Sequence, residues 1–173
     1  ETTSPTIALI IPSLDGKIDD LHASIQRQTV QPDELEVVLD VRPNGRARNE
    51  GVDRTGGEIL VFVDDDAVLG NEQTIERLIA PLRTDASIGV TGTAKILPPD
   101  ADTWQQRVAR EVPRIEHPVV FQHLETNPDP PAYYCEITTT CCAMRREVFA
   151  QAGRFNNTLI RGVDSEIFVR MRN

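Results

Sequence analysis

The stretch Ile59-Leu60-Val61-Phe62-Val63-Asp64-Asp65-Asp66 decides the fold of this chain. Its apolar first part predicts a strand buried on both faces, the kind found in parallel sheets. Three carboxylates follow where the strand ends. Ligands of open α/β sheets bind beyond the carboxyl ends of the strands, and adjacent carboxylates repel one another unless a cation or polar contacts compensate. The stretch therefore predicts a divalent metal that holds a phosphorylated ligand. The alternative is an acidic turn facing water.

Strands and helices alternate on both sides of this stretch. Further strands are predicted over residues 6–11, 35–39, 88–92 and 133–144, and helices over residues 18–28, 46–54, 72–82, 104–112, 145–151 and from 165 onward. This alternation predicts an α/β fold with a Rossmann-like, mostly parallel central sheet flanked by helices. Residues 100–132 are rich in proline, which predicts a surface excursion over one end of the sheet.

Composition narrows the classes of protein. A chain of 173 residues is long enough for one domain with its own core. Its net charge of −9 argues against a nucleic-acid site built on a basic surface. The chain has three cysteines, Cys135, Cys141 and Cys142, and their spacing is not that of a Cys-x-x-Cys zinc or redox site. We therefore expect reduced cysteines and a cytoplasmic location. Its apolar runs are far shorter than the about 20 residues of a membrane span, so we expect membrane association only through parts outside this chain.

Several stretches in one order carry a resemblance to a known family. The chain resembles the family 2 nucleotide-sugar glycosyltransferases of the GT-A fold. No single stretch is specific, but the ordered set covers nearly the whole chain. The residues that carry it are Ile10–Ser13, Ser24–Thr29, Ala47–Gly51, Gly57–Asp66, Arg145-Arg146, Gly153–Phe155 and Gly162–Glu166.

The resemblance implies a donor site at the strand ends. Asp66 would bind Mg²⁺ or Mn²⁺, because hard divalent ions prefer carboxylate oxygen and keep positions open for phosphate. Asp64 or Asp65 would contact the ribose or a metal-bound water. Pro12 and Ser13, at the end of the first strand, would belong to the nucleotide-sugar site.

The resemblance also assigns nucleotide contacts to Asp40 and Arg48. Asp40 ends the second strand, where the family places an acid that reads the nucleobase, and a carboxylate can accept a hydrogen bond from a base N–H. Arg48 would contact the base or the diphosphate. The alternatives are an Asx turn at Asp40 and simple charge balance at Arg48.

Asp164 is the residue that the resemblance makes catalytic. In the family, the Asp of a Glu-Asp pair acts as general base on the acceptor hydroxyl, and here Val163 replaces the Glu. The alternative is a structural role in which Asp164 caps a helix.

The chain departs from the family in two further places. Only Val41 to Gly45 separate Asp40 from the next helix, where the family usually has another helix and strand. The chain also stops before the Gln-x-x-Arg-Trp element of processive members, so a polymerising synthase is not supported. It ends inside a predicted helix without a capping Gly or Pro, which predicts that the catalytic domain is truncated at its C-terminus.

The resemblance implies an inverting, metal-dependent hexosyltransferase of cell-envelope glycan synthesis. It would move a sugar from a nucleotide-diphosphate sugar to a saccharide or lipid-linked acceptor. Residues 1–95 would bind nucleotide and metal, and residues 96–173 would bind the acceptor. A sugar nucleotidyltransferase is one alternative, but it would carry a Gly-rich loop after the first strand, and Pro12–Gly16 is poor in glycine. A non-catalytic nucleotide-sugar binding module is the other, favoured by Val163 and the expected truncation.

Overall fold

The computed structural model describes residues 4–98, 100–111 and 137–171. The described residues fall into two compact units, one from Glu1–Gly92 with Tyr133–Asn173 and one from Thr93–Ala132. The first unit contains the sheet and every predicted site residue, and the second contains α4 (Thr103–Glu111). The predicted division into a nucleotide half and an acceptor half concerns function and stays a prediction.

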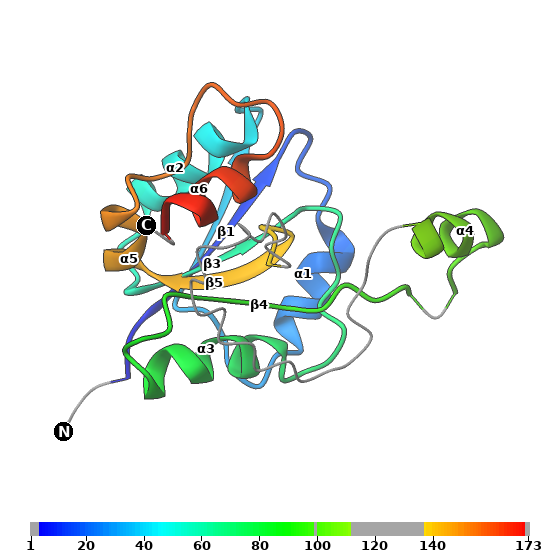
Figure 1. Cartoon of the computed structure of the whole chain (residues 1–173). Coiled ribbons are helices and arrows are strands. Elements are labelled where there is room, and N and C mark those ends of the chain that lie inside the picture. The colour runs from blue at the N-terminus through cyan, green and yellow to red at the C-terminus, as the bar shows by residue number, and fades with distance from the viewer. Residues whose placement is uncertain (1–3, 99, 112–136, 172–173) are drawn as a thin grey trace, which may run out of the picture. The chain divides into compact units, whose positions relative to one another are not determined.

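A five-stranded sheet forms the centre of the first unit (Figure 1). Its strands are β1 (Ile7–Ser13), β2 (Glu34–Leu39), β3 (Ile59–Val63), β4 (Val90–Gly92) and β5 (Cys141–Arg145), in the order β2-β1-β3-β5-β4. β1 is parallel to β2 and β3, whereas β5 is antiparallel to β3 and β4. The predicted α/β fold with a mostly parallel sheet is confirmed.

The strand bounds differ from the prediction in four strands: β2 begins at Glu34 instead of Leu35, β4 begins at Val90 instead of Ile88, and β1 and β5 differ more. β1 continues through Pro12 to Ser13, because these residues still pair with Val38 and Leu39 of β2. The strand predicted over residues 133–144 is observed as β5, Cys141–Arg145. Residues 137–140 precede it outside the strand, and residues 133–136 lie outside the described part.

Helices cover both faces of the sheet. Besides α4 they are α1 (Asp19–Gln26), α2 (Asn44–Arg54), α3 (Thr74–Thr84), α5 (Arg146–Gln151) and α6 (Val163–Met171). The chain passes from β2 into α2 without another helix or strand, so the connection is short as the sequence indicated. No helix in the described ranges has the length and apolar character needed to cross a membrane.

Alternation along β1 divides the core into two layers. Successive strand residues point to opposite faces, so Ile7, Leu9 and Ile11 pack with α1 and α3, while Ala8 and Ile10 pack with α2, α5 and α6. Figure 1 shows these two groups of helices on opposite sides of the sheet. Because both faces are covered, all residues of β1 are buried.

Two glycines of α2 allow close packing near the strand ends. A Cβ on Gly51 would lie 2.4 Å from Cγ2 of Ile10, so only glycine lets the helix rest on β1. A Cβ on Gly45 would lie 2.7 Å from the Asn156 carbonyl oxygen and 3.0 Å from Cγ1 of Val163. The beginning of α2 is therefore packed against the beginning of α6, where Asp164 lies.

Candidate functional site

The carboxyl ends of β1 and β2 are joined through Ser13. Its backbone carbonyl accepts a hydrogen bond from the Asp40 N–H over 3.0 Å, and its Oγ accepts one from the Gly16 N–H, also over 3.0 Å. Ser13 is buried, while the Asp40 side chain is exposed and contacts no polar partner among the described residues. Asp40 has a φ of 53°, in the left-handed region that Asp tolerates better than most residues. The structure thus leaves the Asp40 carboxylate free at the sheet edge.

The acidic run after β3 forms a turn. The Asp64 N–H donates to the Thr140 carbonyl over 3.1 Å, and the Asp64 carbonyl accepts from the Ala67 N–H over 3.1 Å. Asp65 and Asp66 are the central residues of this turn, as the acidic-turn alternative expected. Asp66 is exposed, Asp65 is half-buried, and neither side chain has a hydrogen-bond or ion-pair partner in the described part of the chain. The turn therefore presents two uncompensated carboxylates.

The donor atoms of this turn fit one kind of metal site. Within the described ranges, no group of three or more His, Cys, Asp and Glu side chains is arranged to hold an ion. Mg²⁺ is commonly bound through one or two carboxylates, with substrate phosphates and water completing its shell. The free carboxylate of Asp66 fits that kind of site and does not fit an all-protein cage. The assignment of Asp66 as metal ligand stays a prediction.

Arg48 and Asp64 form an ion pair that the sequence did not indicate. Nη2 of Arg48 lies 2.5 Å from Oδ1 of Asp64, and its Cζ lies 5.7 Å from the centroid of the Phe155 ring. Arg48 is only 3% exposed. The predicted direct contact of Arg48 with a nucleotide is not tested, but the charge-balance alternative has a specific partner in Asp64.

Asp164 lies in the first turn of α6. The helix begins at Val163, and the Gly162 carbonyl accepts the first intrahelical hydrogen bond from the Glu166 N–H over 3.0 Å. Gly162 therefore occupies the N-cap position, and the alternative that placed Asp164 there is wrong. The Asp164 carboxylate is half-buried, and within the described ranges it accepts only the Ser165 N–H, over 3.0 Å.

Val163, which replaces the family's Glu, belongs to the core. It is 6% exposed and packs in the same layer as Phe155, Ile167 and Phe168. A carboxylate at this position would be buried among apolar side chains, at a large desolvation cost. The substitution is therefore consistent with the local packing and leaves Asp164 in place.

The pKa of the buried Cys142 thiol is affected by the charges of three site residues. Burial raises the pKa of its thiol well above the usual value, and the neighbouring Cys141 adds to this shift. The charge of Arg48 opposes the shift, whereas the charges of Asp64 and Asp164 reinforce it. The charges of Asp164, from α6, and of Asp64, after the end of β3, thus act on the same buried sulfur.

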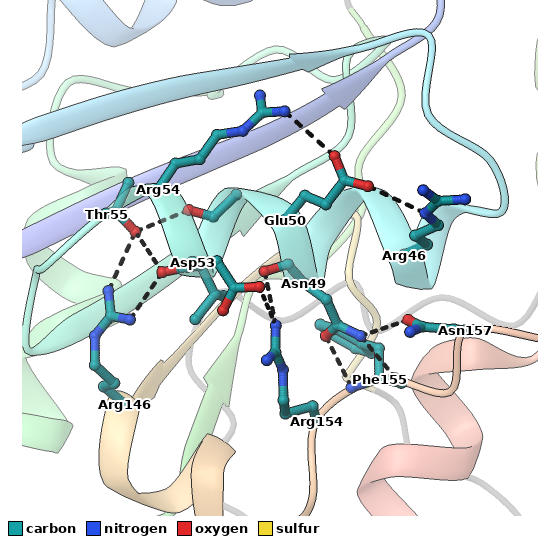
Figure 2. A network of polar contacts seen from close by, with 12 residues as sticks. Arg46, Asn49, Glu50, Asp53, Arg54, Thr55, Arg146, Arg154, Phe155 and Asn157 are labelled. Atoms are coloured by element: carbon teal, nitrogen blue, oxygen red, sulfur yellow. Dashed lines mark hydrogen bonds and ion pairs between the residues drawn. The ribbon is translucent and has the colours of Figure 1, made fainter.

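A polar network holds α2 to the turn after α5 (Figure 2). The Asn49 amide donates to the Phe155 carbonyl over 2.8 Å and accepts from the Phe155 N–H over 3.1 Å. It also donates to Oδ1 of Asn157 over 2.7 Å. Arg154 donates to the Asn49 carbonyl and to the Asp53 carboxylate, over 2.9 and 2.8 Å. Two of the stretches that carried the resemblance, 47–51 and 153–155, are thus joined by hydrogen bonds.

Other stretches of the resemblance also have structural partners. Arg146 donates to the Gly57 and Val52 carbonyls, over 2.7 and 3.0 Å (Figure 2 shows its contacts with the end of α2). Gln28 accepts from the Ile75 N–H over 3.0 Å and Ser24 accepts from the Leu69 N–H over 3.1 Å, which fixes the segment after the acidic run. These pairings lie far apart in sequence, and the residue types alone did not identify them.

The predicted donor and metal residues lie apart from the main hollow of the first unit. A hollow of about 360 Å³ lies elsewhere, between α2 and the turn after α5, and is lined by Arg46, Asn49, Glu50, Asp53, Gly153, Arg154, Phe155 and Asn157. None of the predicted donor or metal residues lines it. The free carboxylates, and not this hollow, therefore define the candidate site.

Comparison with known proteins gives one family and several similar folds. The sequence model of Glycosyl transferase family 2 matches residues 10–153, a range that includes the acidic run and ends before Asp164. No curated protein sequence matches the chain.

Three solved structures illustrate the similar folds. A mannosyltransferase, PcManGT from Pyrobaculum calidifontis in complex with GDP-Man and Mn²⁺, has a TM-score of 0.63 at 17% identity and covers 98% of this chain and 52% of that one. TarS 1-349 from S. aureus has a TM-score of 0.62 at 16% identity, with 96% and 55% covered. A glucosyl-3-phosphoglycerate synthase from Mycobacterium tuberculosis, in complex with phosphoglyceric acid, has a TM-score of 0.59 at 17% identity, with 95% and 64% covered. The chain spans about half to two thirds of these proteins, and likeness at such identity shows the fold alone.

Proposed function

The chain belongs to glycosyl transferase family 2, and from this premise we propose that it transfers a sugar from a nucleotide-diphosphate sugar to a hydroxyl acceptor, with inversion at the anomeric carbon. The observation that carries the proposal is the set of carboxylates at the carboxyl edge of the sheet. Asp40, Asp65 and Asp66 have no partner among the described residues, and Asp164 accepts a single backbone N–H. Carboxylates left without protein partners are available to a ligand.

The donor would lie across the ends of β1, β2 and β3. Asp40 would accept a hydrogen bond from the nucleobase, beside Pro12 and Ser13, and Asp64 or Asp65 would accept one from the ribose or a metal-bound water. A nucleotide sugar is supported by two similar structures, which contain GDP-Man with Mn²⁺ and UDP-Glc with Mn²⁺.

Asp66 would hold Mg²⁺ or Mn²⁺. When bound, the ion would supply positive charge that stabilises the diphosphate as it leaves. Asp66 suits this role because its exposed carboxylate has no other partner in the described part of the chain. The diphosphate would need such local compensation, because the chain as a whole carries a net charge of −9.

Asp164 would act as the general base. Its carboxylate would take the proton of the acceptor hydroxyl while that oxygen forms a bond to the anomeric carbon and the bond from this carbon to the diphosphate oxygen breaks. One displacement without an enzyme nucleophile inverts the configuration. The acceptor would be a saccharide or a lipid-linked precursor. The reaction would take place in the cytoplasm.

Nucleotide binding tests this proposal most directly. Calorimetric titration of UDP and GDP, with Mn²⁺ and with chelator, should show binding of at least one nucleotide that Mn²⁺ strengthens. A thermal-unfolding screen should agree, because a ligand at 100 times its Kd adds about 2.7 kcal/mol of stability. Absence of binding for every nucleoside diphosphate, with and without metal, would overturn the proposal. Binding without transfer to any acceptor would instead support the binding-module alternative.

A further inference from the structure

The buried guanidinium of Arg48 is the part of the site that the proposed function does not explain. Arg48 projects from α2, is 3% exposed, and bonds to Asp64 over 2.5 Å. Its Nε is buried and has no hydrogen-bond partner among the residues that the structure describes. A residue that grips a nucleotide directly needs donors at the surface, and this side chain is almost wholly covered.

Stability alone is a poor reason for such an arrangement. A buried ion pair is often no more stabilising than apolar side chains of the same volume. A buried N–H without a partner adds a further cost and requires an explanation. Arg48 does gain from the Phe155 ring, which lies 5.7 Å from its Cζ. That contact also restricts the positions that the guanidinium can take.

Asp64 differs from its two neighbours because its backbone and its side chain both form hydrogen bonds. Its N–H bonds to Thr140, its carbonyl bonds to Ala67, and Oδ1 bonds to Arg48. Its side chain is nevertheless 28% exposed. Asp65 and Asp66 have no side-chain partner among the described residues. Asp64 is therefore the carboxylate of the acidic run that combines a fixed direction with access to a ligand.

We propose that Arg48 is a positioning residue that holds the Asp64 carboxylate in one orientation, so that Asp64, and not Arg48, contacts the nucleotide. This inference rests on the proposed function and changes the part that Arg48 plays in it. A pre-oriented carboxylate loses no further rotamer freedom on binding, so it binds hydroxyl donors such as those of ribose more tightly than a free one. The planar guanidinium fork of Arg, whose Cζ lies 5.7 Å from the centroid of the Phe155 ring, suits this task better than the flexible ammonium of Lys.

A double-mutant cycle separates positioning from direct contact. The parent, Arg48→Met, Asp64→Asn and the double variant are titrated with UDP and GDP in the presence of Mn²⁺. We expect each single variant to bind about tenfold more weakly, and the double variant to be no weaker than Asp64→Asn, because Arg48 acts through Asp64. Losses that multiply to about a hundredfold would mean that Arg48 contacts the nucleotide itself, and would overturn the inference.

A second measurement needs no nucleotide. In Arg48→Met, hydrogen exchange of the backbone N–H groups over residues 64–67 should accelerate about tenfold, while residues 59–63 of β3 stay protected. Unchanged exchange over 64–67 would contradict the positioning role even if no nucleotide is found to bind. If the parent binds no nucleotide but exchange accelerates as expected, the proposed function fails while the hold of Arg48 on Asp64 stands.

The control variant is Arg54→Met. Arg54 is on the same helix and pairs with Glu36 and Glu50, over 3.0 and 3.2 Å, but it is the last residue of α2, six positions after Arg48. Nucleotide affinity and exchange over 64–67 should be unchanged in it. If Arg48→Met does not fold, Arg48→Lys takes its place, and partial loss of affinity is expected. Full affinity in Arg48→Lys would show that charge alone, without the fork, is sufficient and would contradict the proposed orientation.

Discussion

The two edges of the central sheet use carboxylates in opposite ways. At the amino edge, where the parallel strands begin, Asp33 accepts the Ile7 N–H over 2.7 Å, and Glu34 accepts the Gly56 N–H over 3.0 Å. Glu58 accepts the Thr6 N–H over 3.1 Å. At the carboxyl edge Asp40, Asp65 and Asp66 accept nothing from the described residues. At the carboxyl edge only Asp64 of the acidic run has a side-chain partner in the described part of the chain, Arg48. We therefore expect the carboxylates of the amino edge to be structural and the unpaired ones of the carboxyl edge to bind a ligand.

We expect the two edges to differ in both stability and binding. Substitutions at the carboxyl edge should change binding or transfer while stability stays close to that of the parent. Substitutions at the amino edge should lower stability while nucleotide binding stays close to that of the parent. Each variant below is therefore measured for both stability, by denaturant unfolding, and nucleotide binding, by calorimetry.

The largest effect is expected for Asp164→Asn. Loss of a general base typically lowers the rate by about 10² to 10⁴, so transfer of sugar to an acceptor should nearly disappear while donor affinity stays close to that of the parent. Product formation by single-turnover kinetics measures the effect. Ser165→Ala, at the exposed neighbouring position, should transfer at the parent's rate. Transfer by Asp164→Asn within a few-fold of the parent would remove Asp164 from the mechanism.

The next effect concerns the acidic run. Asp66→Ala should abolish the part of nucleotide-diphosphate binding that depends on Mn²⁺, because no other side chain is proposed as ligand. Glu147→Ala is the matched control, since Glu147 is an exposed carboxylate at the beginning of α5, which follows the end of β5 at the amino edge. Equal affinity of Asp66→Ala and parent, with chelator making no difference to either, would refute the metal assignment.

Asp40→Asn should show a smaller effect that is specific for the base. A hydrogen bond to a charged group is worth about 1.5 to 3 kcal/mol, or roughly ten- to over a hundredfold in affinity. The preferred nucleotide should lose affinity and the preference among bases should narrow. If UDP and GDP bind this variant as they bind the parent, Asp40 is only a residue of the turn after β2.

The smallest effect is expected at the amino edge. Asp33→Asn replaces a carboxylate acceptor of the Ile7 N–H with an amide, and because Asp33 is exposed the loss should be about 1 kcal/mol of unfolding free energy. Denaturant unfolding measures this loss, and nucleotide affinity should stay at the parent's value. A loss of affinity here comparable with that of Asp40→Asn would remove the distinction between the two edges.

Much of the fold was predictable because burial and strand period are local properties. The apolar runs of β1 and β3 contain enough buried residues in a row to identify covered strands, and the helices between them follow from short periodic patterns. The antiparallel direction of β5 was not predictable, because nothing in the residues Cys141–Arg145 records which neighbour they pair with. The predicted start of α6 was also wrong: the helix begins at Val163 and not at Ser165, so Asp164 lies in its first turn and not at the N-cap.

The candidate site was predictable only in part, because the positions of its carboxylates are local properties and their partners are not. A carboxylate that directly follows a strand must lie at the sheet edge, so Asp40 and Asp64–Asp66 could be assigned from the sequence. The partners of these residues could not. Arg48 pairs with Asp64 across 16 positions, and Asn49 bonds with Asn157 across 108, so neither contact leaves a periodic signal.

The sequence by itself determined the alternation of strands and helices, the family, and the edge at which the carboxylates gather, because each depends on residue type and order along the chain. Only the tertiary structure decided which carboxylates are free. Asp33 and Asp40 flank the same strand β2, yet one is bonded to a backbone N–H of β1 and the other has no partner in the described part. The physical reason is that compensation of a charge depends on which groups reach it in space, and packing brings those groups from distant parts of the chain.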